Sequence, residues 1–247
     1  MIDRVFIGIG LASSQASVDD TQIAPVELGN AGITRQEWVY LQLKEAVLTG
    51  QFVPGRSVTL RGIAQMLGTS PTPVREALRR LVAERALEAH GNRRVSVPRM
   101  TPSKLQDLCA VRANLEAFAA ERAMPLIDEA HLERLWELDG EVDAAIDAGD
   151  IRAYLQRHRA FHFTLYDVGD ASAVMPLIES VWLQFSPFLR LAIHHIGSDY
   201  IVDRHVEALR AVAARDAQAL RFAIEADVRE GLGSLTEADW RNLEAAG

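Results

Sequence analysis

Apolar residues recur with a helical period along most of the chain, so the sequence predicts a mainly helical protein. The clearest case is the stretch 70–82, in which apolar residues spaced i, i+4, i+7 and i+8 form one stripe. The stripe consists of Val74, Leu78, Leu81 and Val82. Arg75, Arg79 and Arg80 lie off it, and Ser70 stands where an N-cap side chain accepts backbone N–H groups. The pattern therefore predicts a capped helix with one apolar and one basic side.

A second short helix is predicted immediately upstream, over residues 60–67. It ends at Gly68, a residue suited to a left-handed turn. A third amphipathic helix is predicted over residues 38–48. Two short helices joined by a glycine-containing turn are typical of a helix-turn-helix, whose second helix enters the major groove of DNA with its N-terminus first.

Downstream of the basic helix, residues 86–97 alternate between apolar and polar types. This pattern predicts a β-hairpin that turns at Gly91 and Asn92, with Arg93 and Arg94 at or near the tip. A basic hairpin directly after a helix-turn-helix is typical of a wing.

The run LTGQFVPGRSVTLRGIAQMLGTSPTPVREAL, residues 48–78, resembles the winged helix-turn-helix of GntR-family transcription regulators, and the resemblance extends over about residues 35–98. It implies that this segment binds double-stranded operator DNA. Three positions depart from the family pattern: many members have an acidic residue at Gly62, a basic one at Pro71 and a glycine at Arg94. By position, the DNA-contacting residues of the family fall on Arg61, Ser70, Thr72 and Arg75, with Gly91, Arg93 and Arg94 in the wing.

The second half of the chain has helical periodicity throughout. Short connections imply antiparallel neighbours and hence an all-α helical bundle. This half resembles the FCD effector-binding domain of the FadR subfamily. The predicted helices span 102–123, 128–147, 151–168, 171–196, with a bend at Pro176 or Pro187, 199–214 and 216–238. The predicted division is an N-terminal arm (1–34), a DNA-binding domain (35–98), an effector-binding and dimerisation domain (102–238) and a C-terminal tail (239–247).

Two histidines of the bundle stand one helical turn apart. His158 and His162 occupy positions i and i+4, which share one helix face with their Cβ atoms about 5–6 Å apart. This spacing is used to bind a metal from a single helix, although isolated helical histidines are more often surface or core residues. His205 and Asp227 are the further candidate ligands.

The FCD resemblance gives these residues a common role. The family holds a divalent metal with one Asp and three His, the Asp four residues before the first His. Carried over by position, the family Asp falls on His158, the three His on His162, His205 and Asp227. The two end positions are thus exchanged, and the total of three imidazoles and one carboxylate is kept. Such a set suits Zn²⁺, which we expect, as well as Ni²⁺ or Mn²⁺.

The effector is expected to be a small carboxylate that binds beside the metal. Arg112 falls where the family has its effector-contacting arginine, and the alternative is a salt bridge to Glu116 one turn away. Arg190 is a second, weaker candidate. The adjacent pair His194 and His195 is a rival to the metal ligands, but neighbouring residues point about 100° apart on a helix.

Charge is divided unevenly between the two halves. The whole chain has a net charge of -8, yet residues 35–100 hold 11 Lys and Arg against 5 Asp and Glu. Residues 101–247 hold 14 against 25. This division is expected when only the first half contacts phosphate. The alternative is that the arginines merely solvate helix surfaces.

Composition supports a folded, cytoplasmic protein. Apolar residues make up 49% of the chain and charged residues 24%, and the single cysteine, Cys109, cannot form an internal disulfide. No apolar run approaches the ~20 residues of a membrane span. We therefore expect a cytoplasmic protein with no membrane partner.

Together these patterns predict a ligand-responsive transcription regulator that binds DNA as a homodimer, because one recognition helix reads few base pairs. One alternative is a DNA-binding dimer whose second half is a structural module without an effector. Another is a metal-dependent enzyme with Glu179 or Glu207 as the base. The sequence contains none of the common catalytic motifs, so we predict that the protein is not an enzyme.

Overall fold

The computed structural model describes residues 23–24, 32–169, 171, 173–196, 204–231 and 240–241, without the side chains of Asn92 and of residues 191–196. Most of the predicted N-terminal arm and C-terminal tail lies outside the described residues. None of the described helices is both long and apolar enough to cross a membrane.

The first half folds into a winged helix-turn-helix, as predicted. Its small sheet is antiparallel with the order β1-β3-β2, and Val95 of the central strand lies opposite Val58 and Ala89. The first of these strands is only two residues long and was not predicted from the sequence. The elements are α1 (Arg35–Leu48), β1 (Val58–Thr59), α2 (Leu60–Met66), α3 (Pro71–Ala83), β2 (Glu88–His90), the 3-10 turn η1 (Gly91–Arg93) and β3 (Arg94–Ser96).

The turn between α2 and α3 is set by Gly68. This residue has a φ of +57°, and its N–H and that of Thr69 donate to the carbonyls of Gln65 and Ala64. These two bonds define a Schellman motif, which ends a helix with a left-handed residue. Ser70 occupies the N-cap position of α3 as predicted, but the predicted side-chain cap bond is absent there. The prolines that follow it contribute fewer N–H donors to the first turn.

Three of the four residues in the predicted apolar stripe of α3 lie in the core of this domain, and Val82 is half-buried. Val74 and Leu81 are fully buried, and α3 packs against α1. On the outer side, the guanidinium of Arg80 lies 3.4 Å from the centre of the Tyr40 ring of α1. The basic side of α3 therefore stays at the surface while its apolar side fixes it to the rest of the domain.

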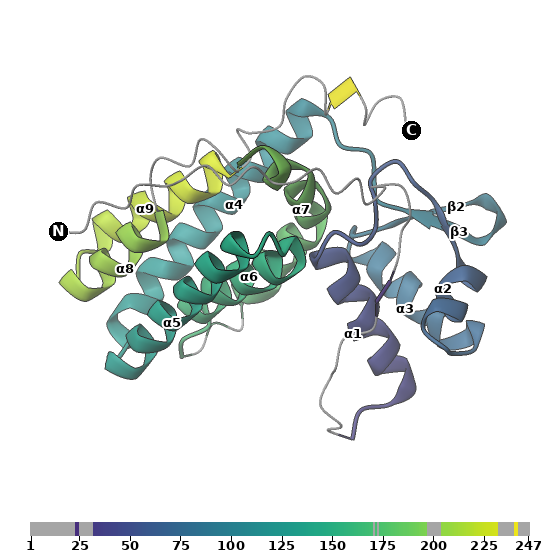
Figure 1. The fold of residues 1–247 in the computed structure, drawn as a ribbon, viewed down its shortest axis with the longest axis horizontal. Coiled ribbons are helices and arrows are strands. Elements are labelled where there is room, and N and C mark those ends of the chain that lie inside the picture. The colour runs from purple at the N-terminus through teal and green to yellow at the C-terminus, as the bar shows by residue number, and fades with distance from the viewer. Residues whose placement is uncertain are drawn as a thin grey trace.

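The second half is the predicted all-α bundle (Figure 1). Its closest helix pairs are α4 with α9, α5 with α6 and α8 with α9. Several observed boundaries differ from prediction: α6 ends at Tyr166, α7 starts at Met175, α9 ends at Glu230, and α5 and α9 each start one residue later than predicted. Residues 199–203 and 232–238 lie outside the described residues. The helices are α4 (Pro102–Ala123), continued by the turn η2 (Met124–Leu126), α5 (Glu129–Asp147), α6 (Ile151–Tyr166), α7 (Met175–Ile196), α8 (Arg204–Ala214) and α9 (Ala217–Glu230).

The two halves meet where α1 lies beside α6 and α7 (Figure 1). The carboxylate of Glu45 accepts hydrogen bonds from Gln156 at 2.9 Å and from Arg159 at 2.7 Å. Next to it, Lys44 forms an ion pair with Glu179 at 2.8 Å. One turn of α1 therefore supplies several polar contacts between the domains.

Candidate functional site

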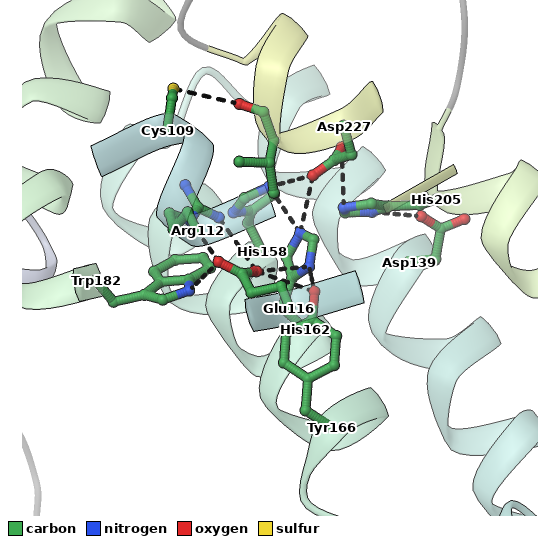
Figure 2. Close-up of polar contacts among 11 residues, drawn as sticks. Cys109, Arg112, Glu116, Asp139, His158, His162, Tyr166, Trp182, His205 and Asp227 are labelled. Atoms are coloured by element: carbon green, nitrogen blue, oxygen red, sulfur yellow. Dashed lines mark hydrogen bonds and ion pairs between the residues drawn. The ribbon is translucent and has the colours of Figure 1, made fainter. Parts of the chain in front are cut away.

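Four predicted metal ligands lie together in the middle of the bundle. His158 and His162 come from α6, His205 from α8 and Asp227 from α9, and Figure 2 shows their polar ends pointing toward one another. All four are buried, with exposed fractions of 0% to 8%. One potential ligand atom from each lies within 4.8 Å of the others. The sequence thus identified residues that are far apart in the chain but adjacent in the fold.

The distances within the cluster match a metal site in part. The Nε2 atom of His162 lies 3.2 Å from Nε2 of His158 and 3.2 Å from Oδ2 of Asp227. Bonds of about 2.0–2.1 Å to a tetrahedral ion would separate its ligands by about 3.3 Å. The carboxylate of Asp227 is 4.0 Å from His158 and 3.9 Å from His205. The ligand atoms, which lie within 4.8 Å of one another, would therefore have to approach by up to about 1.5 Å to bind a metal ion.

A buried chain of hydrogen bonds fixes His162 through Nδ1, on the side of the ring that faces away from the cluster. Its Nδ1 lies 2.8 Å from the hydroxyl of Tyr166, and that hydroxyl donates to Glu116 at 2.9 Å. Since the single tyrosine proton goes to the carboxylate, Nδ1 of His162 is the donor to the tyrosine oxygen. The lone pair of Nε2 then faces the cluster, which is the tautomer that a metal requires.

His205 is held in the same way by a different helix. Its Nδ1 lies 3.0 Å from Oδ1 of Asp139, a buried residue of α5. The ring also stacks on Phe161, with a centroid distance of 4.0 Å. A carboxylate behind a histidine orients the ring and increases its basicity as a ligand. Nε2 of His205 is accordingly directed at Asp227.

His158 has a different environment from the other two histidines. Its buried Nδ1 has no hydrogen-bond partner among the described residues. The ring is held by stacking instead, on Tyr154 at 5.4 Å and on His205 at 5.2 Å. Burial and the neighbouring His162 lower the pKa of His158 well below its ordinary value of 6.5. His158 is therefore neutral at physiological pH.

Asp227 supplies the negative charge of the cluster. Burial alone would raise the pKa of its carboxyl group, but the neighbouring His162, His205 and His158 hold that pKa well below its usual value. The residue is thus a carboxylate, and one carboxylate with three imidazoles is a donor set that several divalent metals accept.

Arg112 forms the salt bridge to Glu116 that the sequence offered as its alternative role. Both side chains are buried, and the guanidinium contacts the carboxylate through Nε and Nη2. Burial alone would lower the pKa of Arg112, but the Glu116 carboxylate raises it above its ordinary value. Trp182 completes the arrangement, since its Nε1 donates to Glu116 at 3.0 Å and its ring lies 4.2 Å from the guanidinium.

A narrow pocket opens beside the cluster. Its volume is about 20 Å³, which is room for about one water molecule. Of the four clustered residues, only His158 and Asp227 are among the described residues that line it. The remaining lining residues include Arg112, Tyr154, Phe185, Leu189 and Arg204. Arg112 therefore borders this pocket as well as pairing with Glu116.

Arg190 does not lie in this pocket. It is on α7, and its Nη1 is 3.5 Å from the carbonyl oxygen of Thr49 in the winged domain. A Cβ atom on Gly50 would come within 2.7 Å of the Arg190 side chain, so the two segments pack tightly. The structure thus locates Arg190 at the contact between the domains. The rival pair His194 and His195 lies outside the described side chains.

The predicted DNA contacts share one property, which is exposure. Arg93 adopts a left-handed φ of +59° in the turn of the wing, where the sequence had suggested Gly91 and Asn92 as the turning residues. Arg94 donates to Ser57 at 3.1 Å, which ties the wing to the loop before β1. All seven predicted residues are exposed: Arg61, Ser70, Thr72, Arg75, Gly91, Arg93 and Arg94.

The sequence did not indicate a metal-site role for three of the residues that surround the candidate metal ligands. Asp139 and Tyr166 were not singled out, and Glu116 was considered only as a partner of Arg112. A signal did exist for Tyr166, because it stands four residues after His162 on the same helix face. Asp139 had no such signal, since it faces His205 from a helix 66 residues away.

Comparison with known protein families decides the classification. The model of bacterial regulatory proteins of the gntR family matches residues 35–97, and the FCD domain model matches residues 107–230. The chain belongs to the GntR family of regulators with an FCD domain. It is a DNA-binding transcription regulator.

Individual relatives agree with this classification. The HTH-type transcriptional regulator McbR of Escherichia coli K12 is 27% identical over 197 residues, which cover 78% of this chain and 89% of that protein. YdhC of Bacillus subtilis, an uncharacterised HTH-type regulator, is 29% identical over 143 residues, 58% of this chain and 64% of its own length. The solved structure of McbR, 24% identical, has the same fold, with a TM-score of 0.77 over 85% of this chain and 99% of that one. These relatives are regulators of transcription and not enzymes.

Proposed function

We propose that this regulator binds a divalent metal at His158, His162, His205 and Asp227, and that a small carboxylate binding beside the metal alters its affinity for operator DNA. The convergence of these four buried side chains is the observation that supports the proposal. Zn²⁺ is the expected ion, and Ni²⁺ or Mn²⁺ would suit the same donors.

The charges around the cluster favour a divalent cation. Three buried acidic residues, Glu116, Asp139 and Asp227, surround it, and Arg112 is the buried basic residue that faces them. Counted as ionised, these four groups leave two negative charges in the interior of the bundle. Uncompensated buried charge is costly, and one divalent ion would balance it. The bound metal would supply an electrophilic centre for carboxylate oxygens.

The pocket offers a route for the effector. A carboxylate entering beside His158 and Asp227 would meet the metal position with Arg112 on the pocket wall. Its affinity would then depend on coordination to the metal and on the adjacent guanidinium. The salt bridge of Arg112 to Glu116 holds the guanidinium in a fixed orientation for this purpose.

We further propose that α6 connects the effector site to the winged domain. One face of this helix bears His158 and His162, and the side chains of Gln156 and Arg159 bind Glu45 of α1. A displacement of α6 on ligand binding would therefore change the position of α1, which packs directly on the recognition helix α3. The ligand can shift this equilibrium only by its difference in affinity for the two arrangements.

In the DNA complex, Thr72 and Arg75 at the start of α3 would contact base edges in the major groove, with Ser70 and Arg61 on the phosphates. Ser70 has no cap bond, so its hydroxyl is available for a phosphate oxygen. In the wing, Gly91, Arg93 and Arg94 would contact the sugar-phosphate backbone of the DNA. Two such units in a cytoplasmic homodimer would read two half-sites of an operator.

The test is an operator titration of the metal-loaded protein with and without a panel of small carboxylates. A saturable, carboxylate-induced change in DNA affinity that disappears after chelation supports the proposal. An operator affinity that no carboxylate changes, with metal bound, would favour the second candidate, a bundle that serves only as a structural module. The salt bridges that tie α1 to the bundle give that candidate its support.

A further inference from the structure

The three histidines of the cluster are held to different degrees. His162 is fixed through Tyr166 and His205 through Asp139, each by a hydrogen bond to Nδ1. The Nδ1 of His158 has no hydrogen-bond partner among the described residues, although the side chain is 91% buried. In Figure 2 the supporting hydrogen bond of His162 runs to Tyr166, one turn further along α6, and that of His205 runs to Asp139 of α5. His158 therefore lacks the outer partner that fixes a metal ligand.

The histidine without a hydrogen bond at Nδ1 is also the one that borders the pocket. His158 lines it together with Asp227, whereas His162 is completely buried behind them. A ligand that arrives through the pocket thus meets His158 before it meets the other two imidazoles. In addition, Nε2 of His158 is 4.0 Å from the Asp227 carboxylate, compared with 3.2 Å for Nε2 of His162.

The small size of the pocket also indicates that His158 moves when a carboxylate binds. A space of about 20 Å³ admits one water molecule but not a carboxylate group with its carbon chain. Space must therefore be created when an organic acid binds. Rotation of the His158 ring would create it, because the ring forms part of the pocket wall and no described side chain holds its outer nitrogen.

From these observations we infer that His158 is an exchangeable ligand, and that an incoming small carboxylate takes its place on the metal while His162, His205 and Asp227 stay bound. The inference rests on the metal site proposed above. In the exchange, the bond from the metal to Nε2 of His158 breaks and a bond to a carboxylate oxygen forms. Neither a proton nor an electron has to be transferred.

The first experiment compares metal affinities by competition with a chromophoric chelator, using Co²⁺ and Zn²⁺ alone. His158→Ala should weaken binding by less than about 10-fold, and Asp139→Ala, which removes an outer partner, by about 10- to 100-fold. His205→Ala, which removes a supported ligand, should weaken binding more than either of these. His158→Gln, which keeps most of the side-chain volume, serves as the second variant if His158→Ala unfolds, as judged by circular dichroism.

The second experiment observes the exchange in the wild-type protein. Imidazoles bound through Nε2 to Co²⁺ give strongly shifted signals from their Nδ1 protons in nuclear magnetic resonance spectra. We expect three such signals, of which one disappears on addition of acetate. His158→Gln should give two signals from the start, with no loss when acetate is added.

The outcomes separate the inference from the proposed function. Acetate that binds with all three signals retained, or a His158→Gln variant that loses metal as completely as His205→Ala, would overturn the inference and leave the metal site intact. A wild-type protein that binds neither Co²⁺ nor Zn²⁺ would overturn the proposed function itself.

Discussion

Arg75 in the winged domain and Arg112 in the bundle are chemically identical but have opposite environments. Arg75 is exposed on α3, while Arg112 is buried and neutralised by Glu116. A surface that binds a polyanion needs cations that stay hydrated in the free protein. Phosphates or bases of the nucleic acid then replace the water around these cations. A buried site has to balance its charges internally, because the low dielectric makes every unpaired charge costly. We therefore expect the same side chain to contribute DNA affinity in one domain and orientation in the other.

Breaking the buried arrangement should have the largest effect on stability. Glu116→Ala would leave Arg112 buried without its counter-ion and remove the acceptor of Tyr166 and Trp182. We expect a loss of about 3–5 kcal/mol in the free energy of unfolding, measured by urea denaturation.

The matched control is Glu121→Ala. Glu121 lies on α4, like Glu116, but its ion pair with Arg221 of α9 is near the surface. That change should cost less than about 1 kcal/mol. Equal losses from the two substitutions would contradict the distinction between the buried and the exposed arrangement.

Removing the exposed arginine should instead affect DNA binding. Arg75→Ala is expected to weaken specific operator binding by about 1–3 kcal/mol, roughly 10- to 100-fold, with the thermal unfolding unchanged. Arg134→Ala, which removes an exposed arginine from α5, is the control and should leave operator affinity unaltered. Quantitative footprinting at fixed salt measures both, and an unchanged footprint with Arg75→Ala would refute the assigned role.

The smallest predicted effect concerns two exposed glycines of the winged domain. Gly68→Ala should destabilise the protein by about 1 kcal/mol, because an alanine is strained at a φ of +57°. Gly91 has no left-handed φ and no atom near its potential Cβ, so Gly91→Ala should change stability by less than about 0.5 kcal/mol. Thermal denaturation of the two variants compares them, and a larger loss at Gly91 would contradict the geometry of the wing.

The winged domain was predicted more completely than the bundle site, and the reason is the range of the interactions. The turn at Gly68 and the stripe beginning at Val74 depend on residues within a few positions of each other, so their pattern is visible in the sequence. β1 was missed because a strand of two residues is too short to alternate, and it exists only through its pairing with β3.

In the bundle, the ligand pair of α6 was visible as a helical repeat, and the resemblance to FCD domains supplied His205 and Asp227. The supporting side chains were not predictable in this way. Asp139 contacts His205 only because α5 and α8 pack together, and no local pattern records that contact. The contact of Arg190 with Thr49 depends likewise on how α7 meets the winged domain.

The central claim, a metal ion within the buried cluster, is tested most directly by elemental analysis of the purified, untagged protein beside His162→Ala. His162 is the most deeply buried of the four residues and lies 3.2 Å from both His158 and Asp227. We expect about one Zn, Ni or Mn per chain in the wild-type protein and a loss of that metal in the variant. Absence of metal from both proteins, even after incubation with excess ion, would contradict the claim.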